Sequence, residues 1–328
     1  MKLTITALIC IVIVALIAYG CSNYIGIPKK KAASNLKAYL QREYNGKLTF
    51  NDLNLFFNAA TMDPNMYTVH IFDKEIPEIE FYTHLNLKDI LENDSLPMYA
   101  KSDEMTFDIL YKEALKRYNT RQAVIGDFKN EISDILFNHE IIELSFNTNL
   151  TPEALKDIIT RFINRLNQSI DDLDSAYNQS LLIKTPQYPE GFITIALESE
   201  NYKIAPYFLS EQMADFKALE KKVEANIQAK IDHTFPKFKI NDHRKIFIDK
   251  SSLSKGAWVQ YLDDKTIKNT GNGKWENPQK GLYIVYFDLQ SLFIYRGEMI
   301  TENNDKTSYD EELQQITNAI KAEGLIIK

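Results

Sequence analysis

Apolar positions recur along this chain at two spacings, one typical of helices and one typical of strands. Spacings of three and four residues predict helices over five segments: 33–46, 103–118, 151–170, 211–231 and 308–324. Alternation with a period of two, or a short apolar run, predicts strands over 47–58, 67–71, 79–81, 140–146, 192–197, 202–209, 246–248, 257–262, 282–287 and 292–296. Residues 127–137 are expected to extend the second helix. Strands that follow one another across short turns predict antiparallel sheets packed with helices, which is the α+β fold class.

The helix over residues 151–170 has the clearest signals in the chain. Thr151 is a good N-terminal cap, and Pro152 suits the first helical turn because its missing N–H would have no intrahelical partner there. The expected buried stripe consists of Leu155, Ile158, Ile159, Phe162, Ile163, Leu166 and Ile170.

One order of elements, a helix followed by several antiparallel strands, occurs near residues 33–86 and again near 211–300. The two copies share no residue-level identity, so the repetition is one of architecture. The segment Ile183–Glu190 contains two prolines, and we place a boundary between two lobes there. The predicted order is an apolar N-terminal segment, a basic tether, an N-terminal α+β lobe and a C-terminal α+β lobe: 1–21, 22–32, 33–185 and 186–328.

The run Leu3–Tyr19 contains no charged residue. As a helix it would be about 25 Å long, at the short edge of what spans the hydrocarbon core of a bilayer. Three interpretations remain open for it: a cleaved secretion signal, an uncleaved membrane anchor, and the signal of a lipoprotein. Each of them predicts a protein of the membrane or the cell envelope.

The residues Ile17-Ala18-Tyr19-Gly20-Cys21 resemble a bacterial lipobox. The resemblance implies that Cys21 becomes the lipid-modified first residue of the mature chain, so that membrane lipid is a partner and the folded part faces the periplasm or the cell exterior. If the segment stays uncleaved, the lysines Lys29, Lys30 and Lys31 favour a cytoplasmic location for the C-terminal domain instead.

Composition narrows the class of partner. The chain has 328 residues and a net charge of −7, and removal of residues 1–20 takes away only one charged residue, Lys2. Such an acidic chain does not attract a phosphate backbone, so nucleic-acid binding is not expected. The only cysteines are Cys10 and Cys21, so the folded part has no disulfide, no cysteine-based metal site and no cysteine nucleophile.

The histidines offer limited chemistry. His139, Glu140 and Glu143 have part of the spacing of a zinc-protease helix, but Glu143 replaces the second histidine and residues 140–146 are expected to form a strand. Two Asp-His pairs place a carboxylate beside His233 and beside His243, an arrangement that can orient an imidazole for acid–base work. Neighbours in sequence point in different directions, so surface histidines are the simpler interpretation.

Two further motifs are incomplete. The acidic residues Asp171, Asp172 and Asp174 begin like a calcium loop but lack its glycine and its closing glutamate. The stretch Gly271–Trp275 contains Gly-Lys without the Ser/Thr of a phosphate loop, and is expected at a hairpin tip. Trp275 is there either a contact residue for a partner or part of the core of the C-terminal lobe.

No nucleophile elbow and no paired-glycine nucleotide fingerprint occurs in the sequence. We therefore expect a non-enzymatic envelope module that binds another protein or has a structural role, without a cofactor and without a metal ion. The alternative is an envelope hydrolase that uses carboxylates together with His233 or His243.

Overall fold

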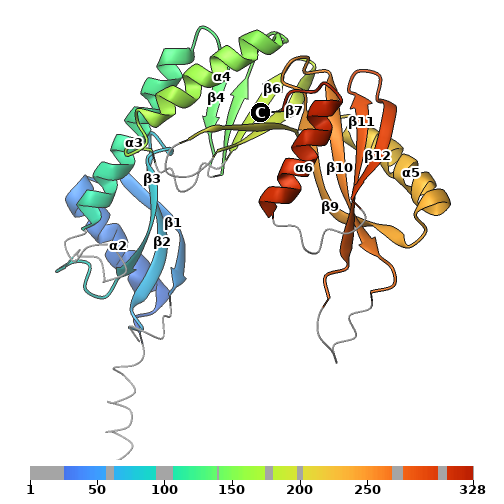
Figure 1. Ribbon diagram of the computed structural model, residues 1–328. Coiled ribbons are helices and arrows are strands. Elements are labelled where there is room, and N and C mark those ends of the chain that lie inside the picture. The colour runs from blue at the N-terminus through green and yellow to red at the C-terminus, as the bar shows by residue number, and fades with distance from the viewer. Residues whose placement is uncertain are drawn as a thin grey trace, which may run out of the picture. The chain divides into compact units, whose positions relative to one another are not determined.

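The computed structural model in Figure 1 describes residues 26–56, 63–93, 106–138, 140–173, 180–197, 202–267, 276–301 and 309–327. Over these ranges the fold is α+β, as predicted, with helices packed on largely antiparallel sheets. The chain divides into two compact units, residues 1–120 and 121–328, which are taken separately below.

The first unit is a helix followed by a three-stranded antiparallel meander. Its elements are α2 (Lys29–Tyr44), β1 (Leu48–Leu55), β2 (Met66–Asp73), β3 (Glu80–Asn86) and the first part of α3 (Phe107–Phe128), with the sheet order β1-β2-β3. Leu36 and Tyr39 of α2 lie in one core with Ile71 of the sheet and Phe107 of α3. The helix ends where predicted, because Asn45 takes a left-handed conformation and its N–H donates to the Leu40 carbonyl.

The second unit is built on one nine-stranded sheet. The strands are β4 (Asp134–Phe137), β5 (Ile141–Ser145), β6 (Ser180–Thr185), β7 (Tyr188–Leu197), β8 (Ile204–Leu209), β9 (Phe238–Ile248), β10 (Lys255–Asp264), β11 (Gln279–Asp288) and β12 (Phe293–Thr301). They lie side by side in reverse chain order, from β12 to β4. All neighbouring strands are antiparallel except β5 and β6, which are parallel and are joined through a helical crossover.

Helices cover both faces of this sheet. The helices are α4 (Pro152–Asn167), α5 (Phe216–Thr234) and α6 (Tyr309–Ala322). Phe162 of α4 and Leu219 of α5 share a core with Trp258 of β10. The next residue of β10, Val259, lies in a different core with Ile316 of α6. Because successive residues of a strand point to opposite faces, α6 covers the face opposite α4 and α5 (Figure 1).

The region between α3 and β5 differs from the expectation. The helix ends at Phe128, and residues 134–137, expected to be helical, form strand β4. Ile135 is buried opposite Leu144 of β5, so pairing with a distant strand decides the conformation of this short segment.

The segment Ile183–Glu190, where the boundary between two lobes was predicted, lies within the second compact unit. It holds the end of β6 and the beginning of β7, which are paired neighbours in the nine-stranded sheet. Strand β6 itself was not predicted. Among the residues that the structure describes, a helix is followed by a meander in α2 with β1–β3, in α4 with β6–β8, and in α5 with β9–β12.

Candidate functional site

A hollow of about 530 Å³ lies between helix α5 and the start of strand β12. Its lining is mainly apolar with a few polar groups: Lys222, Ala225, Asn226, Ser291, Leu292, Phe293 and Ile294. The hollow is shallow and wide open to solvent, so it suits contact with a larger partner better than enclosure of a small molecule. We take this hollow as the candidate functional site.

The helix side of the hollow follows from the amphipathic pattern of α5. Leu219, Val223 and Ile227 are fully buried on the sheet, which leaves the adjoining surface of the helix beside β12. From this surface Lys222 donates a hydrogen bond through Nζ to the Leu292 carbonyl, at 3.2 Å. Asn226 approaches Gly297 of β12, where a Cβ would lie only 3.2 Å from its Oδ1 atom.

The strand side of the hollow begins at a tight turn. The Asp288 carboxylate accepts hydrogen bonds from the N–H and the hydroxyl of Ser291, at 2.9 and 2.6 Å, and these bonds lower the pKa of Asp288. Residues 288–291 thus form the turn that the sequence predicts between the strands expected at 282–287 and 292–296. The next residue, Leu292, has a φ of 52°, a left-handed conformation that costs about 1–2 kcal/mol for a side chain of this kind.

Leu292, in this strained conformation, comes directly before an exposed aromatic residue. Phe293 is 63% exposed, and Tyr295 on the same strand is 37% exposed. An isolated exposed apolar residue is common, but here a phenylalanine stands at the edge of a hollow beside a strained residue. Full burial of such a side chain by a partner would contribute about 1.5–3 kcal/mol.

The edge of β12 limits how a partner could engage it. β12 is a terminal strand of the nine-stranded sheet, and its pairing with β11 shifts register twice, beside Tyr295 and beside Ile300. Bulges at an edge twist it away from another strand and are a common protection against edge-to-edge pairing. The geometry therefore favours insertion of a side chain into the hollow over the addition of a strand.

A second exposed surface is the outer face of the three-stranded sheet in the first unit. His70 of β2 is held on both ring nitrogens, with Nε2 2.6 Å from Glu80 Oε2 and Nδ1 2.8 Å from Asn51 Oδ1. Its ring stacks on Tyr82 at a centroid distance of 4.3 Å. Tyr82 is 64% exposed, nearly the same fraction as Phe293. The difference is that Tyr82 is already stacked and stands beside no described hollow.

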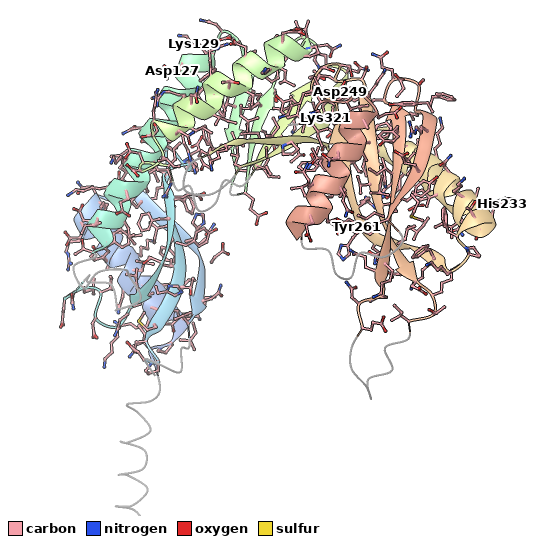
Figure 2. The ribbon with its side chains drawn as sticks, viewed as in Figure 1. Asp127, Lys129, His233, Asp249, Tyr261 and Lys321 are labelled. Carbon is pink, nitrogen blue, oxygen red and sulfur yellow. The ribbon has the colours of Figure 1, made fainter. Side chains whose placement is uncertain are left out.

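The predicted acid–base histidines do not come together in a site. His233 lies in the last turn of α5, at the surface, with its Nδ1 3.4 Å from the Thr234 hydroxyl (Figure 2). His243 is an exposed residue of β9 whose backbone N–H donates to Asn241 Oδ1. Asp232, the carboxylate beside His233, accepts from the Gln228 amide instead. Neither histidine lines the hollow between α5 and β12.

Several predicted residues lie outside the described ranges, among them Cys21, His139, Asp174 and Trp275. Of the incomplete zinc motif, Glu140 and Glu143 are described. Glu140 is an exposed residue just before strand β5, and Glu143 lies in β5, as predicted, and is paired with Lys184 at 2.5 Å. Asp171 and Asp172 lie in the turn after α4. Across the part of the chain that the structure describes, no group of three or more metal-ligating His, Cys, Asp or Glu residues gathers.

Lys250 has an unusual environment for a lysine. Its Nζ atom lies 4.8 Å from the ring centroid of Tyr207, and its pKa is lowered by burial and by the positive charge of Lys156. Burial also raises the pKa of the Tyr207 hydroxyl, to about 12. The attraction of an ammonium to a ring face, about 0.5–1 kcal/mol at exposed sites and about 2 kcal/mol at desolvated ones, opposes this lowering of the Lys250 pKa.

Sequence reasoning missed the residues of the hollow, although part of the signal was present. Phe293 falls in a predicted strand, and Ser291 in the predicted turn before it, but neither position reveals that β12 is an edge strand. Lys222 contacts a carbonyl 70 positions away in the chain, which no local pattern can show. His70 was missed as well, although the alternation of Val69 and Ile71 carries the signal that it lies on the opposite face of its strand.

Comparison with protein-family models and with curated protein sequences finds no match for this chain. Among the residues from Gly26 onward that the structure describes, no helix has both the length and the apolar character needed to cross a membrane.

Proposed function

We propose that this chain is a non-enzymatic bacterial envelope protein that is held at the membrane through Cys21 and binds a protein partner at the hollow between α5 and β12. The anchoring part rests on the uncharged run Leu3–Tyr19 and on the lipobox-like residues that follow it. In this proposal the folded part faces the periplasm or the cell exterior.

The observation that carries the binding proposal is the exposure of Phe293 at the edge of the hollow. Aromatic residues that are exposed in the free protein and can be buried by a partner dominate the energetics of many interfaces. The strained backbone of Leu292, held by the Lys222 hydrogen bond, supports the same proposal because strain of this kind concentrates at functional sites.

The lining of the hollow indicates the chemistry of the partner. Lys222 is the one charged side chain among its lining residues, and the rest are apolar or neutral. A complementary segment would present an apolar side chain for the hollow next to a carboxylate for Lys222. We therefore propose a protein partner with an acidic and apolar segment.

A hydrolase that uses His233 and His243 has less support. Both side chains are exposed, and in the described ranges neither faces a hollow together with the carboxylates that such chemistry requires.

The test compares two truncations of equally exposed aromatic residues. Wild type, Phe293→Ala and Tyr82→Ala are each purified from detergent-solubilised membranes of the native host. Wild type and Tyr82→Ala should recover the same partner in stoichiometric amount, and Phe293→Ala should lose it. With the purified partner, Phe293→Ala should raise the Kd roughly 30-fold, which corresponds to about 2 kcal/mol.

Each outcome decides the proposal. Repeated recovery of the protein alone, or equal partner binding by wild type and Phe293→Ala, would contradict it. Loss of binding in Tyr82→Ala alone would move the site to the outer face of β1–β3. Phe293→Ala changes an exposed residue and should alter the stability by no more than about 0.5 kcal/mol. Tyr82→Ala also removes the stacking on His70 and should cost about 0.2–1 kcal/mol.

A further inference from the structure

We propose that a hollow between α2 and β1 of the first unit binds a phosphate group through Lys37 and Lys74. This hollow is partly enclosed and has a volume of about 260 Å³, and its lining includes Lys37, Gln41, Gly46, Leu48, Phe50 and Lys74. That volume holds a phosphate group together with several waters, because one water occupies about 30 Å³. The site is separate from the proposed protein-binding hollow, which belongs to the other compact unit.

The charge of the lining points to an anionic ligand. Two of the described lining residues are lysines and none is acidic, although the chain as a whole has a net charge of −7. Lys37 is an exposed residue of α2, and within the described ranges its amine takes part in no ion pair. A hollow lined by one sign of charge concentrates ligands of the opposite sign, and lysine is a common phosphate-binding residue.

Lys74 comes directly after β2 and reaches the end of α2, where its Nζ atom donates a hydrogen bond to the Gly46 carbonyl. An ammonium has three N–H donors, and the described residues take up only one of them. The C-terminal end of a helix carries partial negative charge, which opposes the binding of an anion. Lys74 offsets this charge at Gly46, and the Leu40 carbonyl already accepts from the N–H groups of Asn45 and Gly46.

Strand β1 adds backbone donors beside the two lysines. The Lys47 carbonyl accepts from the Lys74 N–H at 3.1 Å, so the backbone groups of Lys47 face β2. Alternate residues of an antiparallel strand face the same neighbour, so Leu48 and Phe50 direct their N–H groups away from β2. β1 is an outer strand of its sheet, and both of these residues line the hollow. An anion there can therefore combine the two ammoniums with a backbone N–H.

A phosphate group suits these donors because its several oxygens accept hydrogen bonds from different directions at once. Two sources supply this chemistry, a free phosphate and the headgroup of an anionic phospholipid. The lipid source rests on the proposed anchor, because α2 begins eight residues after Cys21 and a lipid there would keep the first unit close to the membrane surface.

The test measures anion binding by the full-length chain in a neutral detergent. Inorganic phosphate and glycerophosphoglycerol, the deacylated headgroup of phosphatidylglycerol, are each titrated at constant ionic strength, and the Kd is measured by calorimetry. In parallel, the lysines are acetylated at low conversion and each product is quantified by peptide mass spectrometry. Bound anion should slow the acetylation of Lys37 and Lys74 in proportion to its occupancy. It should leave unchanged the acetylation of Lys129, an exposed lysine of the second unit (Figure 2).

Matched variants separate this site from a general attraction of anions to lysines. Lys37→Gln should raise the Kd about tenfold, as expected for the loss of one charged hydrogen bond. Lys37→Arg keeps the charge and should bind within about threefold of wild type. Lys88→Gln removes an exposed charge that does not line the hollow, and should leave the Kd unchanged. Both replaced lysines are exposed, so these variants should fold.

The outcomes decide both the site and the source of the phosphate. A tighter affinity for glycerophosphoglycerol than for inorganic phosphate would identify a lipid headgroup, and an equal or weaker affinity would identify a free phosphate. Absence of protection at Lys37 and Lys74 by both anions, equal slowing at Lys129, or an unchanged Kd in Lys37→Gln would overturn the proposal. The titration does not require a lipid on Cys21, so its failure would leave the anchor proposal standing.

Discussion

Asp249 joins the end of β9 to the C-terminal segment of the chain, and it is almost completely buried. Its carboxylate accepts hydrogen bonds from the Ile326 N–H at 2.8 Å and from the Ser251 hydroxyl at 2.8 and 2.9 Å. Burial by itself would raise the pKa of Asp249, but the hydrogen bonds from Ile326, Ser252 and Ser251 outweigh it and lower the pKa below 3.8. A buried charge is tolerated here because hydrogen bonds satisfy it.

This carboxylate makes the stability of the second unit depend on pH. Because the folded-state pKa is depressed, the stabilisation is present above the unfolded-state pKa near 3.8 and is lost as the pH falls through the folded value. We expect Asp249→Asn to lower the free energy of unfolding by about 1.5–3 kcal/mol at pH 7, and by less below about pH 4. Both tryptophans, Trp258 and Trp275, belong to residues 121–328, so urea denaturation followed by their fluorescence reports on this unit.

The control for this measurement is Asp171→Asn, which changes an exposed carboxylate in a turn and should have an effect within about 0.5 kcal/mol. A wild-type stability for Asp249→Asn at pH 7, or a deficit that is equally large at low pH, would show that the buried carboxylate does not stabilise the fold in this way.

At the scale of single elements, α4 is the one whose structure follows most directly from its sequence. Thr151 caps it as expected, with Oγ1 accepting from the Ala154 N–H at 3.2 Å, and Pro152 is its first residue. Six residues of the predicted stripe are buried: Leu155, Ile158, Ile159, Phe162, Ile163 and Leu166. The seventh, Ile170, lies beyond the helix end and packs, partly buried, against the same core.

A pair of identical substitutions in α4 separates capping from the general loss of a threonine hydroxyl. Thr151→Ala removes the acceptor for an N–H that has no other intrahelical partner, and should destabilise the second unit by about 1 kcal/mol. Thr160→Ala removes a hydroxyl that donates to the Lys156 carbonyl, which is already bonded within the helix, and should change stability by less than about 0.5 kcal/mol. Urea denaturation measures both, and equal losses in the two variants would contradict the capping role of Thr151.

Other elements could not be predicted because their conformation depends on distant partners. β4 has only four residues, too few to show a clear alternation of apolar and polar positions, and it forms because it pairs with β5. β6 lies between two neighbouring strands, so its residues Leu181, Leu182 and Ile183 are all buried and show no alternation. From sequence alone, a short apolar run of this kind can be read as a strand or as part of a connection, which is why a boundary between two lobes was predicted at the end of β6.

The candidate site was less predictable than the fold for the same reason. The sequence places a turn at 288–291 and a strand after it, but the exposure of Phe293 depends on the position of β12 at the edge of the sheet. The hollow also needs α5, whose Lys222 and Asn226 are far from β12 in sequence. Local patterns therefore indicate the elements that form the hollow but not the hollow itself.

At the scale of the whole molecule, the chain combines two compact units with an N-terminal segment whose chemistry is known only from its sequence. The first described helix, α2, begins at Lys29, only eight residues after Cys21. An extended chain of that length spans at most about 28 Å, so a lipid on Cys21 would keep the first unit close to the membrane surface. The two cysteines of the sequence support this use of Cys21, because neither can pair with a cysteine in the folded part.

The intact mass of the protein extracted from its native membrane tests the anchoring claim most directly. The proposal predicts a chain that begins at Cys21, lacks residues 1–20 and carries added acyl mass. Cys21→Ser is the matched variant, and it should carry no acyl mass. Once residues 1–20 of this variant have been removed by another route, it should also leave the membrane fraction. A membrane-extracted protein with the mass of the full, unmodified chain of 328 residues would contradict the lipoprotein anchor.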